Sequence, residues 1–376
     1  MAAVVVLITA LGPVRAEAPK NQGDGDPAVD LVRQLADRSF ERREEATKRL
    51  LQIGRSAKQA LLEGLKAPDL EVQTRCERIL VTVLEEDFKA RLEAYVADKD
   101  GKQDHDLPGL GRWRKLIGND AGSRELYVEM ARTHGRLLEE ATLAPKAVGE
   151  KFAGECQNLF QRVYAPTVTA RRQITLADVT AMMFIGSDPE VAVTDNARQL
   201  IANLLYQPAF STAVRSGPRS EQVRKLFAAW VVDAKGPAAN QALNMALQYN
   251  LKEGLDLALR LLDDKDFAGG MAVVAIGRLG TKDHLKLLEP LLSDKTVLLN
   301  VNFNNKPGTT EVRDVALAMM VHLTGQPIRD YGYEFFRGTN NEVAYMAPVY
   351  LAFAETAKRD AAFKKWEDWK AKQPRP

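Results

Sequence analysis

The sequence predicts an all-α protein, an α-solenoid of stacked antiparallel helix pairs with a small β-hairpin insertion near residues 296–310. Apolar residues recur at helical spacing along most of the chain, and period-two alternation is nearly confined to that one stretch. A segment that begins at Leu35 also repeats with an offset of 30 residues. Of the 376 residues, 45% are hydrophobic and 27% charged, which is the balance of a folded soluble protein.

The first 27 residues differ from the rest of the chain. An apolar run from Ala2 to Leu11 is followed by the small-x-small sequence of residues 16–18, which predicts a secretory signal peptide over residues 1–18. A polar linker is expected over residues 19–27. No Lys or Arg precedes the apolar run, so a frayed terminus or a short anchor is the alternative. We expect export to the periplasm or the medium, without stable membrane insertion of the mature chain.

Repetition is clearest in the N-terminal repeats, residues 28–97. Asp26 and Pro27 favour a helix start, as N-cap and first-turn residue. Each repeat is expected to contain an Asp-bearing turn, a helix and a second helix. Gly54 ends the first helix because glycine tolerates the left-handed conformation that follows a helix end. The aligned pairs are Phe40 and Leu70, Glu41 and Glu71, Ala46 and Cys76, and Leu50 and Leu80.

The period is lost over residues 98–174, an irregular helical middle that begins with a polar loop at 98–112, and returns with drift over residues 175–330. A capping box at Ser187–Glu190 predicts a helix that reaches about Tyr206. Further helices are predicted at Pro237–Tyr249, at Glu253–Leu262 and at Ala268–Leu279, the last ended by Gly280. Two more are predicted, one capped by Asp283 that reaches Leu292 and one that runs from Glu311 to Gly325.

The hairpin is predicted from alternation between Val297 and Phe303, followed by a turn at Asn304–Gly308. In the C-terminal region, residues 331–376, three aromatic residues recur at a spacing of three among charged ones: Phe363, Trp366 and Trp369. This predicts an amphipathic final helix that caps the last repeat. A docking helix for another protein is the alternative, and exposed aromatic side chains would favour it.

The repeat pattern resembles the HEAT/armadillo-like superfamily, and in particular exported bacterial HEAT-repeat proteins. The resemblance is good over Leu35–Leu84 and Leu261–Gly325 and loose between Ala97 and Leu255. It implies a curved helical surface that is presented to a partner. It indicates the fold and says little about a specific function.

Sequence motifs of enzymes are absent. We find no HExxH, GxSxG, phosphate-binding glycine loop, EF-hand or CxxC motif, so no catalytic residue, cofactor or metal is assigned. His134, His284 and His322 lie in helical segments away from any suggested acidic partner and are interpreted as part-buried helix residues. Cys76 and Cys156 lie among apolar neighbours, which favours buried thiols over a disulfide between them.

The polar loop holds the only weak metal candidates. Asp98, Asp100, Asp104 and Asp106 could offer oxygen ligands to calcium, with His105 beside them. Their spacing fits no known calcium loop, and Lys99 and Lys102 oppose a cation, so a solvated loop is favoured.

A basic cluster with a tryptophan follows the loop, at residues 112–115. Arg112, Arg114 and Lys115 surround Trp113, a combination that nucleic-acid-binding proteins use. Leu116 and Ile117 instead favour a core-facing Trp113 with solvated cations. The net charge of +2 gives no global attraction for nucleic acid, and we expect no nucleic-acid partner.

Taken together, these observations predict a non-enzymatic interaction scaffold in an exported compartment. Its partner would be a protein or a cell-envelope component, and the binding residues are unknown. One alternative is an enzyme with an unrecognised site in residues 98–164, where two or more of Asp104, His105, Asp106 and Glu125 would converge in a cleft. The other alternative is a structural oligomerisation module.

Overall fold

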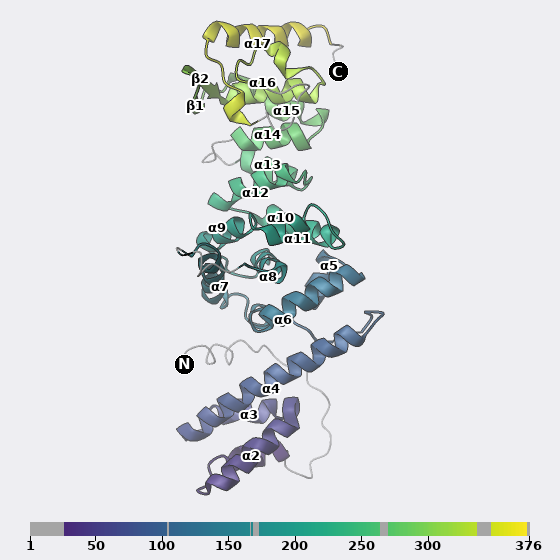
Figure 1. The fold of residues 1–376 in the computed structure, drawn as a ribbon, viewed down its shortest axis with the longest axis vertical. Helices are drawn as coiled ribbons and strands as arrows, with labels where there is room; N and C mark the ends of the chain where they lie inside the picture. The colour runs from purple at the N-terminus through teal and green to yellow at the C-terminus, as the bar shows by residue number, and fades with distance from the viewer. Residues whose placement is uncertain are drawn as a thin grey trace. The chain divides into compact units, whose positions relative to one another are not determined.

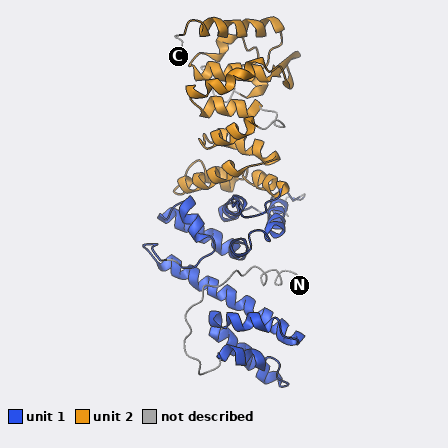
Figure 2. Cartoon of the chain, turned by 180° about the vertical axis from the view of Figure 1, so that it is seen from behind, with its two compact units in different colours: residues 1–194 blue, residues 195–376 orange. Residues whose placement is uncertain are grey.

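The computed structural model describes residues 26–103, 105–165, 167, 173–263, 270–336 and 347–373. The chain divides into two compact units, Met1–Thr194 and Asp195–Pro376 (Figure 2). The all-α prediction is confirmed, since the described residues form helices and one two-stranded antiparallel sheet. The predicted signal peptide lies outside these residues. No helix in the described ranges is both long enough and apolar enough to cross a membrane.

The first unit begins with helices that follow each other after short turns (Figure 1). The Asp26 side chain accepts a hydrogen bond from the Ala28 backbone, and Pro27 occupies the first helical turn, as predicted. The helices are α1 (Pro27–Gln34), α2 (Phe40–Ile53), α3 (Lys58–Gly64), α4 (Leu70–Ala97), α5 (Leu110–Leu116), α6 (Ala121–Leu143), α7 (Gly149–Val163) and α8 (Leu176–Gly186).

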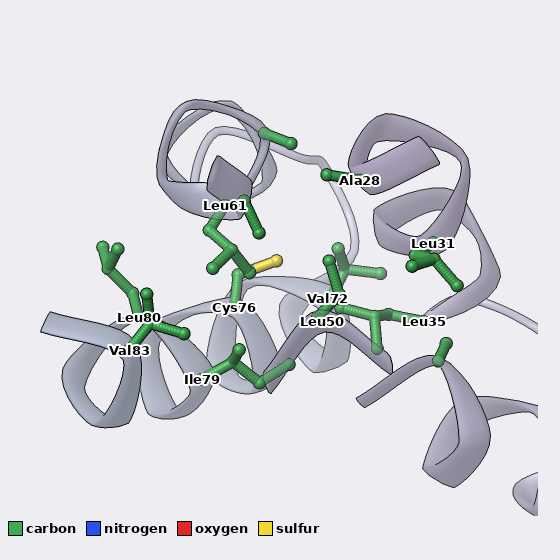
Figure 3. Close-up of a cluster of buried hydrophobic side chains, with 13 residues drawn as sticks. Ala28, Leu31, Leu35, Leu50, Leu61, Val72, Cys76, Ile79, Leu80 and Val83 are labelled. Carbon is green, nitrogen blue, oxygen red and sulfur yellow. The ribbon is translucent and has the colours of Figure 1, made fainter. Parts of the chain in front are cut away.

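The repeat with an offset of 30 residues is confirmed in α2 and α4. The two helices start at Phe40 and Leu70, and the aligned Ala46, Cys76, Leu50 and Leu80 are buried in one apolar core (Figure 3). Both cysteines are free and buried, as predicted. A Cβ at Gly64 would collide with the Cys76 sulfur, so this glycine lets α3 lie close against α4.

Two predicted elements of this unit are wrong. The second repeat has no second helix, because α4 continues unbroken to Ala97 through a stretch that lacks glycine and proline. Ser187 does not open a helix. It ends α8, where its hydroxyl donates to the Phe184 carbonyl, and α9 begins only at Asp195.

In the second unit, helices that follow each other along the chain pack together, α11 on α12, α12 on α13 and α13 on α14, and α14 also packs on α16 (Figure 1). Gly325 has a φ of 79° and follows α16 as predicted. The helices are α9 (Asp195–Leu204), α10 (Pro208–Ala213), α11 (Ser220–Asp233), α12 (Pro237–Gln248), α13 (Gly254–Leu262), α14 (Gly270–Leu279), α15 (Leu285–Leu288), α16 (Val312–Leu323) and α17 (Thr356–Lys370).

The predicted helix after Gly280 is broken into short pieces. Thr281, rather than Asp283, caps the first 3-10 turn, Lys282–His284. The short α15 follows, and Pro290 lies in a second 3-10 helix, Glu289–Ser293. Proline lacks the N–H that a longer α-helix would need, which explains the interruption.

The predicted hairpin is confirmed, with β1 (Val297–Phe303) paired to β2 (Lys306–Glu311). Its turn is shorter than predicted. Only Asn304 and Asn305 form it, both with positive φ, and Lys306 already belongs to β2. Two successive residues with positive φ give the turn whose twist matches that of antiparallel strands. The outer side of β2 is bonded at Thr309 to the backbone of Phe353.

The final helix, α17, packs against α16. Trp366 is buried, and Trp369 stacks on it with 5.0 Å between ring centroids. Arg359 of α17 is also buried and forms an ion pair with Asp314 of α16. The helix therefore covers an apolar and ionic surface of its own unit.

Candidate functional site

The polar loop at 98–112 is built around Asp98. Its carboxylate accepts hydrogen bonds from the backbone N–H groups of Gly101 and Gln103, each at 3.1 Å. His105 contacts the same carboxylate through Nε2, also at 3.1 Å, and this hydrogen bond holds the pKa of Asp98 below its usual value. The Asp98 oxygens are thus occupied by donors from the loop itself.

The other loop carboxylates face different partners. Asp106 is 76% exposed and forms an ion pair with Arg55 at 2.8 Å. Asp100 is exposed, as is Glu125 on α6, and Asp104 lies outside the described residues. In the ranges that the structure describes, no group of three or more His, Cys, Asp or Glu side chains could hold a metal ion.

Three residues of the basic cluster at 112–115 make contacts within the chain. Trp113 is buried and donates its indole N–H to Ser123, which confirms the core-facing prediction. The prediction of solvated cations is wrong for two residues. Arg112 donates to the Phe184 carbonyl, and Arg114 donates to the carbonyls of Gly101 and Gln103. A carbonyl at a helix end or in a loop lacks a backbone donor, and arginine supplies one.

His134 has the partner that the sequence did not suggest. Its Nε2 lies 2.9 Å from an Asp178 oxygen, and its Nδ1 lies 3.9 Å from Glu155. His134 has non-helical φ and ψ angles of −125° and 24°, at a kink inside α6. The prediction of a histidine without an acidic partner is therefore wrong. Asp178 lies 44 residues along the chain, so no local pattern could have linked the two.

Asp178 also forms a capping box with Thr175 at the N-terminus of α8. It accepts hydrogen bonds from the backbone and hydroxyl of Thr175, at 2.7 and 2.8 Å. Burial alone would raise the pKa of Asp178, but the hydrogen bonds from His134 and Thr175 outweigh it and lower the pKa to about 2. With His134 only 8% exposed, this acid–base pair joins α6 to α8 and offers little surface to a substrate.

The two remaining histidines lie in helical turns, as predicted. His284 caps its own 3-10 turn by accepting the Thr281 N–H at Nδ1. His322 is half-buried in α16, where burial and the nearby Arg278 lower its pKa. Neither histidine contacts a carboxylate in the interactions recorded for the described residues.

The strongest candidate for a contact surface is the pair of residues that open α2 and α4. Phe40 is 63% exposed and Leu70 is 74% exposed, although both are large and apolar. Two ion pairs connect the helices at this end, from Arg43 to Glu71 at 3.0 Å and from Arg75 to Glu44 at 2.8 Å. We call these six residues the Phe40–Leu70 surface. The repeat alignment identified the two apolar residues, but only the structure reveals their exposure.

A shallow groove lies elsewhere in the same unit, between the end of α2 and the middle of α4. It has a volume of about 450 Å³. Leu51 and Val83 provide apolar walls, and Arg55, Glu86 and Asp87 provide charged ones. Arg55 is joined to Asp87 of the groove and to Asp106, so these charges are paired within the chain.

No family model matches the sequence, and none of the curated proteins is similar to it. The resemblance to HEAT repeats therefore stays a prediction.

Proposed function

We propose that this chain is a non-enzymatic interaction scaffold of the HEAT type, acting in an exported compartment on a protein or a cell-envelope component. The observation that supports this proposal best is the Phe40–Leu70 surface. Large exposed apolar side chains at matching positions of two repeats are typical of a contact surface, because water solvates them poorly. The interhelical ion pairs hold the two residues in a fixed arrangement before a partner binds.

A scaffold is favoured over the enzyme alternative because the candidate titratable groups of the middle region are engaged in hydrogen bonds and ion pairs within the chain or are exposed singly. A general base must reach a substrate proton. Asp98 is occupied by loop donors, and His134 is enclosed with Asp178. The three described residues of the expected cleft do not share a partner: His105 bonds to Asp98, Asp106 pairs with Arg55, and Glu125 is exposed.

The test uses two matched double variants of the chain. F40S/L70S removes the apolar part of the Phe40–Leu70 surface, and V96S/L143S removes two exposed apolar residues of the same unit that are not related by the repeat. Each variant, and the wild type, is cross-linked in an envelope fraction, and the captured proteins are quantified by mass spectrometry.

We expect F40S/L70S to lose the partners that wild type captures, while V96S/L143S retains them. Interface anchors of this size typically contribute about 1–2 kcal/mol or more each, so the loss should exceed about tenfold. Circular dichroism checks that both variants keep the helical fold. Equal capture by both variants would show that this surface is not the binding site.

A further inference from the structure

Three arginines of the second unit surround the C-terminal end of α12. Arg224 of α11 donates to the backbone carbonyl of Tyr249 at 2.9 Å. Arg278 of α14 donates to the Leu247 carbonyl at 3.1 Å. Arg215, which follows α10, lies over the Tyr249 ring, with 5.5 Å between its guanidinium carbon and the ring centroid. We call these three arginines the arginine cluster.

The arginine cluster has no carboxylate partner. Its hydrogen bonds to the backbone end on neutral carbonyls, and none of its members forms an ion pair within the described parts of the chain. In contrast, Arg198 and Arg359 of the same unit are paired with Asp233 and Asp314. The end of a helix supplies only about half a negative charge. Three guanidinium charges are therefore left largely uncancelled at this end of α12.

Arg278 is part-buried, and part of its guanidinium has no acceptor. Its Nε is enclosed and makes no hydrogen bond to a described residue, and burial lowers its pKa. The Nδ1 of His322, on the adjoining α16, is likewise enclosed and unbonded. A cation in this position costs desolvation free energy that no carboxylate of the cluster's surroundings offsets. An anion from another molecule would offset it.

The cluster can be reached from solvent. Arg215 is exposed, and the other two members are part-exposed. Tyr206, which follows α9, is 49% exposed and lies near Tyr249, whose pKa is raised by burial and further by Tyr206. Lys252 and Glu253, which come after α12, are exposed and opposite in charge, so they cancel each other. The surface thus combines uncancelled positive charge with an exposed aromatic ring.

We propose that the arginine cluster binds an acidic segment of a partner protein through the carboxylates of its aspartates or glutamates. The forked donors of arginine match a carboxylate, and Tyr206 offers an aromatic surface to a side chain of the same segment. A nucleic acid is less suited, because the chain's net charge of +2 provides no wider field for a long polyanion. The Phe40–Leu70 surface lies in the other unit, so either proposal can fail without the other.

The test measures binding of a fluorescently labelled, glutamate-rich peptide that contains one phenylalanine, by fluorescence anisotropy at low salt. R215E and R224E each reverse one charge of the cluster. R260E is the matched control, because Arg260 is exposed and also donates to backbone carbonyls, those of Val232 and Ala234 at the end of α11. The 12 residues of α12, which starts directly after α11, place that end about 18 Å from the cluster.

We expect R215E and R224E to weaken binding of the acidic peptide by about tenfold each, and R260E to change it by less than about twofold. R215E breaks no hydrogen bond to the backbone, and circular dichroism checks the fold of all variants. A peptide with glutamine in place of glutamate should not bind. Equal affinity of wild type, R215E and R224E would overturn the proposal, as would equal binding of the glutamine peptide or no binding of the acidic one. Tighter binding of single-stranded oligothymidine than of the acidic peptide would overturn it in favour of a nucleic acid.

Discussion

Two buried aspartates, one in each unit, occupy the same local position and differ in acidity. Asp178 and Asp314 are each the third helical residue of a capping box, at the start of α8 and α16. Each is joined to a side chain from a distant helix, His134 in one case and Arg359 in the other. Yet the pKa of Asp178 falls to about 2, whereas that of Asp314 rises to about 6.

The difference lies first in burial and then in the charged groups near each pair. Burial raises the pKa of both aspartates, and it is complete at Asp314. Arg359 lies 3.0 Å from Glu311 as well as from Asp314, so its charge is shared and Glu311 repels the aspartate. Glu155 lies 3.9 Å from His134 and is part-exposed. The pKa of a capping-box aspartate therefore depends on its burial, on the cation that reaches it and on the N-cap residue of its own helix, which is Thr175 in one case and Glu311 in the other.

The largest effect is expected from Arg359→Ala. This variant leaves the buried Asp314 without its cation, whereas Glu311 keeps its ion pair with Arg313, and breaking one partner of a buried ion pair costs about 3–5 kcal/mol of unfolding free energy. Chemical denaturation measures the change. Lys364→Ala on the same helix breaks only an exposed pair with Asp368 and should change stability by less than about 0.5 kcal/mol. Similar effects of the two substitutions would refute the assignment of Arg359 as a buried partner.

The second prediction compares the two aspartates by pH. The folded-state pKa of Asp178 lies below its unfolded value of 3.8, so its stabilising contribution is present above about pH 4 and is lost as the pH falls toward 2. The folded-state pKa of Asp314 lies above 3.8, so its contribution is present below about pH 4 and is lost as the pH rises through 6. Each contribution is on the order of 2–3 kcal/mol.

Asp178→Asn and Asp314→Asn separate the two contributions. The unfolding free energy of wild type minus that of each variant is measured between pH 2 and pH 7. We expect the Asp178 difference to increase with pH between 2 and 4, and the Asp314 difference to decrease with pH between 4 and 6. Two curves with the same slope would contradict the comparison.

The sequence predicted many features that depend on neighbouring residues, although not the helix ends near Ser187 and Asp283, and it missed the contacts that depend on distant residues. The helix end at Gly54 and the strand Val297–Phe303 follow from local conformational preference and alternation, and both are confirmed. The contacts of His134 with Asp178 and of Arg359 with Asp314 span 44 and 45 residues, so spacing along the chain carries no trace of them. The exposure of Phe40 and Leu70 was missed because apolarity alone does not show which face of a helix a neighbour covers.

The smallest expected effect on stability is that of Glu155→Gln. Together with Glu311→Gln, it tests how much a second carboxylate contributes to the difference between the pKa values of Asp178 and Asp314. The Glu155 side chain is 34% exposed and lies 3.9 Å from His134, which is beyond hydrogen-bond distance, so the contact contributes little. Its loss should change the unfolding free energy by less than about 0.5 kcal/mol and leave the pKa of Asp178 near 2. In contrast, Glu311→Gln should lower the pKa of Asp314 below about 6, because Arg359 would then face one carboxylate. Titration of the two aspartates by NMR in both variants measures these shifts, and an Asp314 pKa unchanged in Glu311→Gln would leave burial alone as the cause.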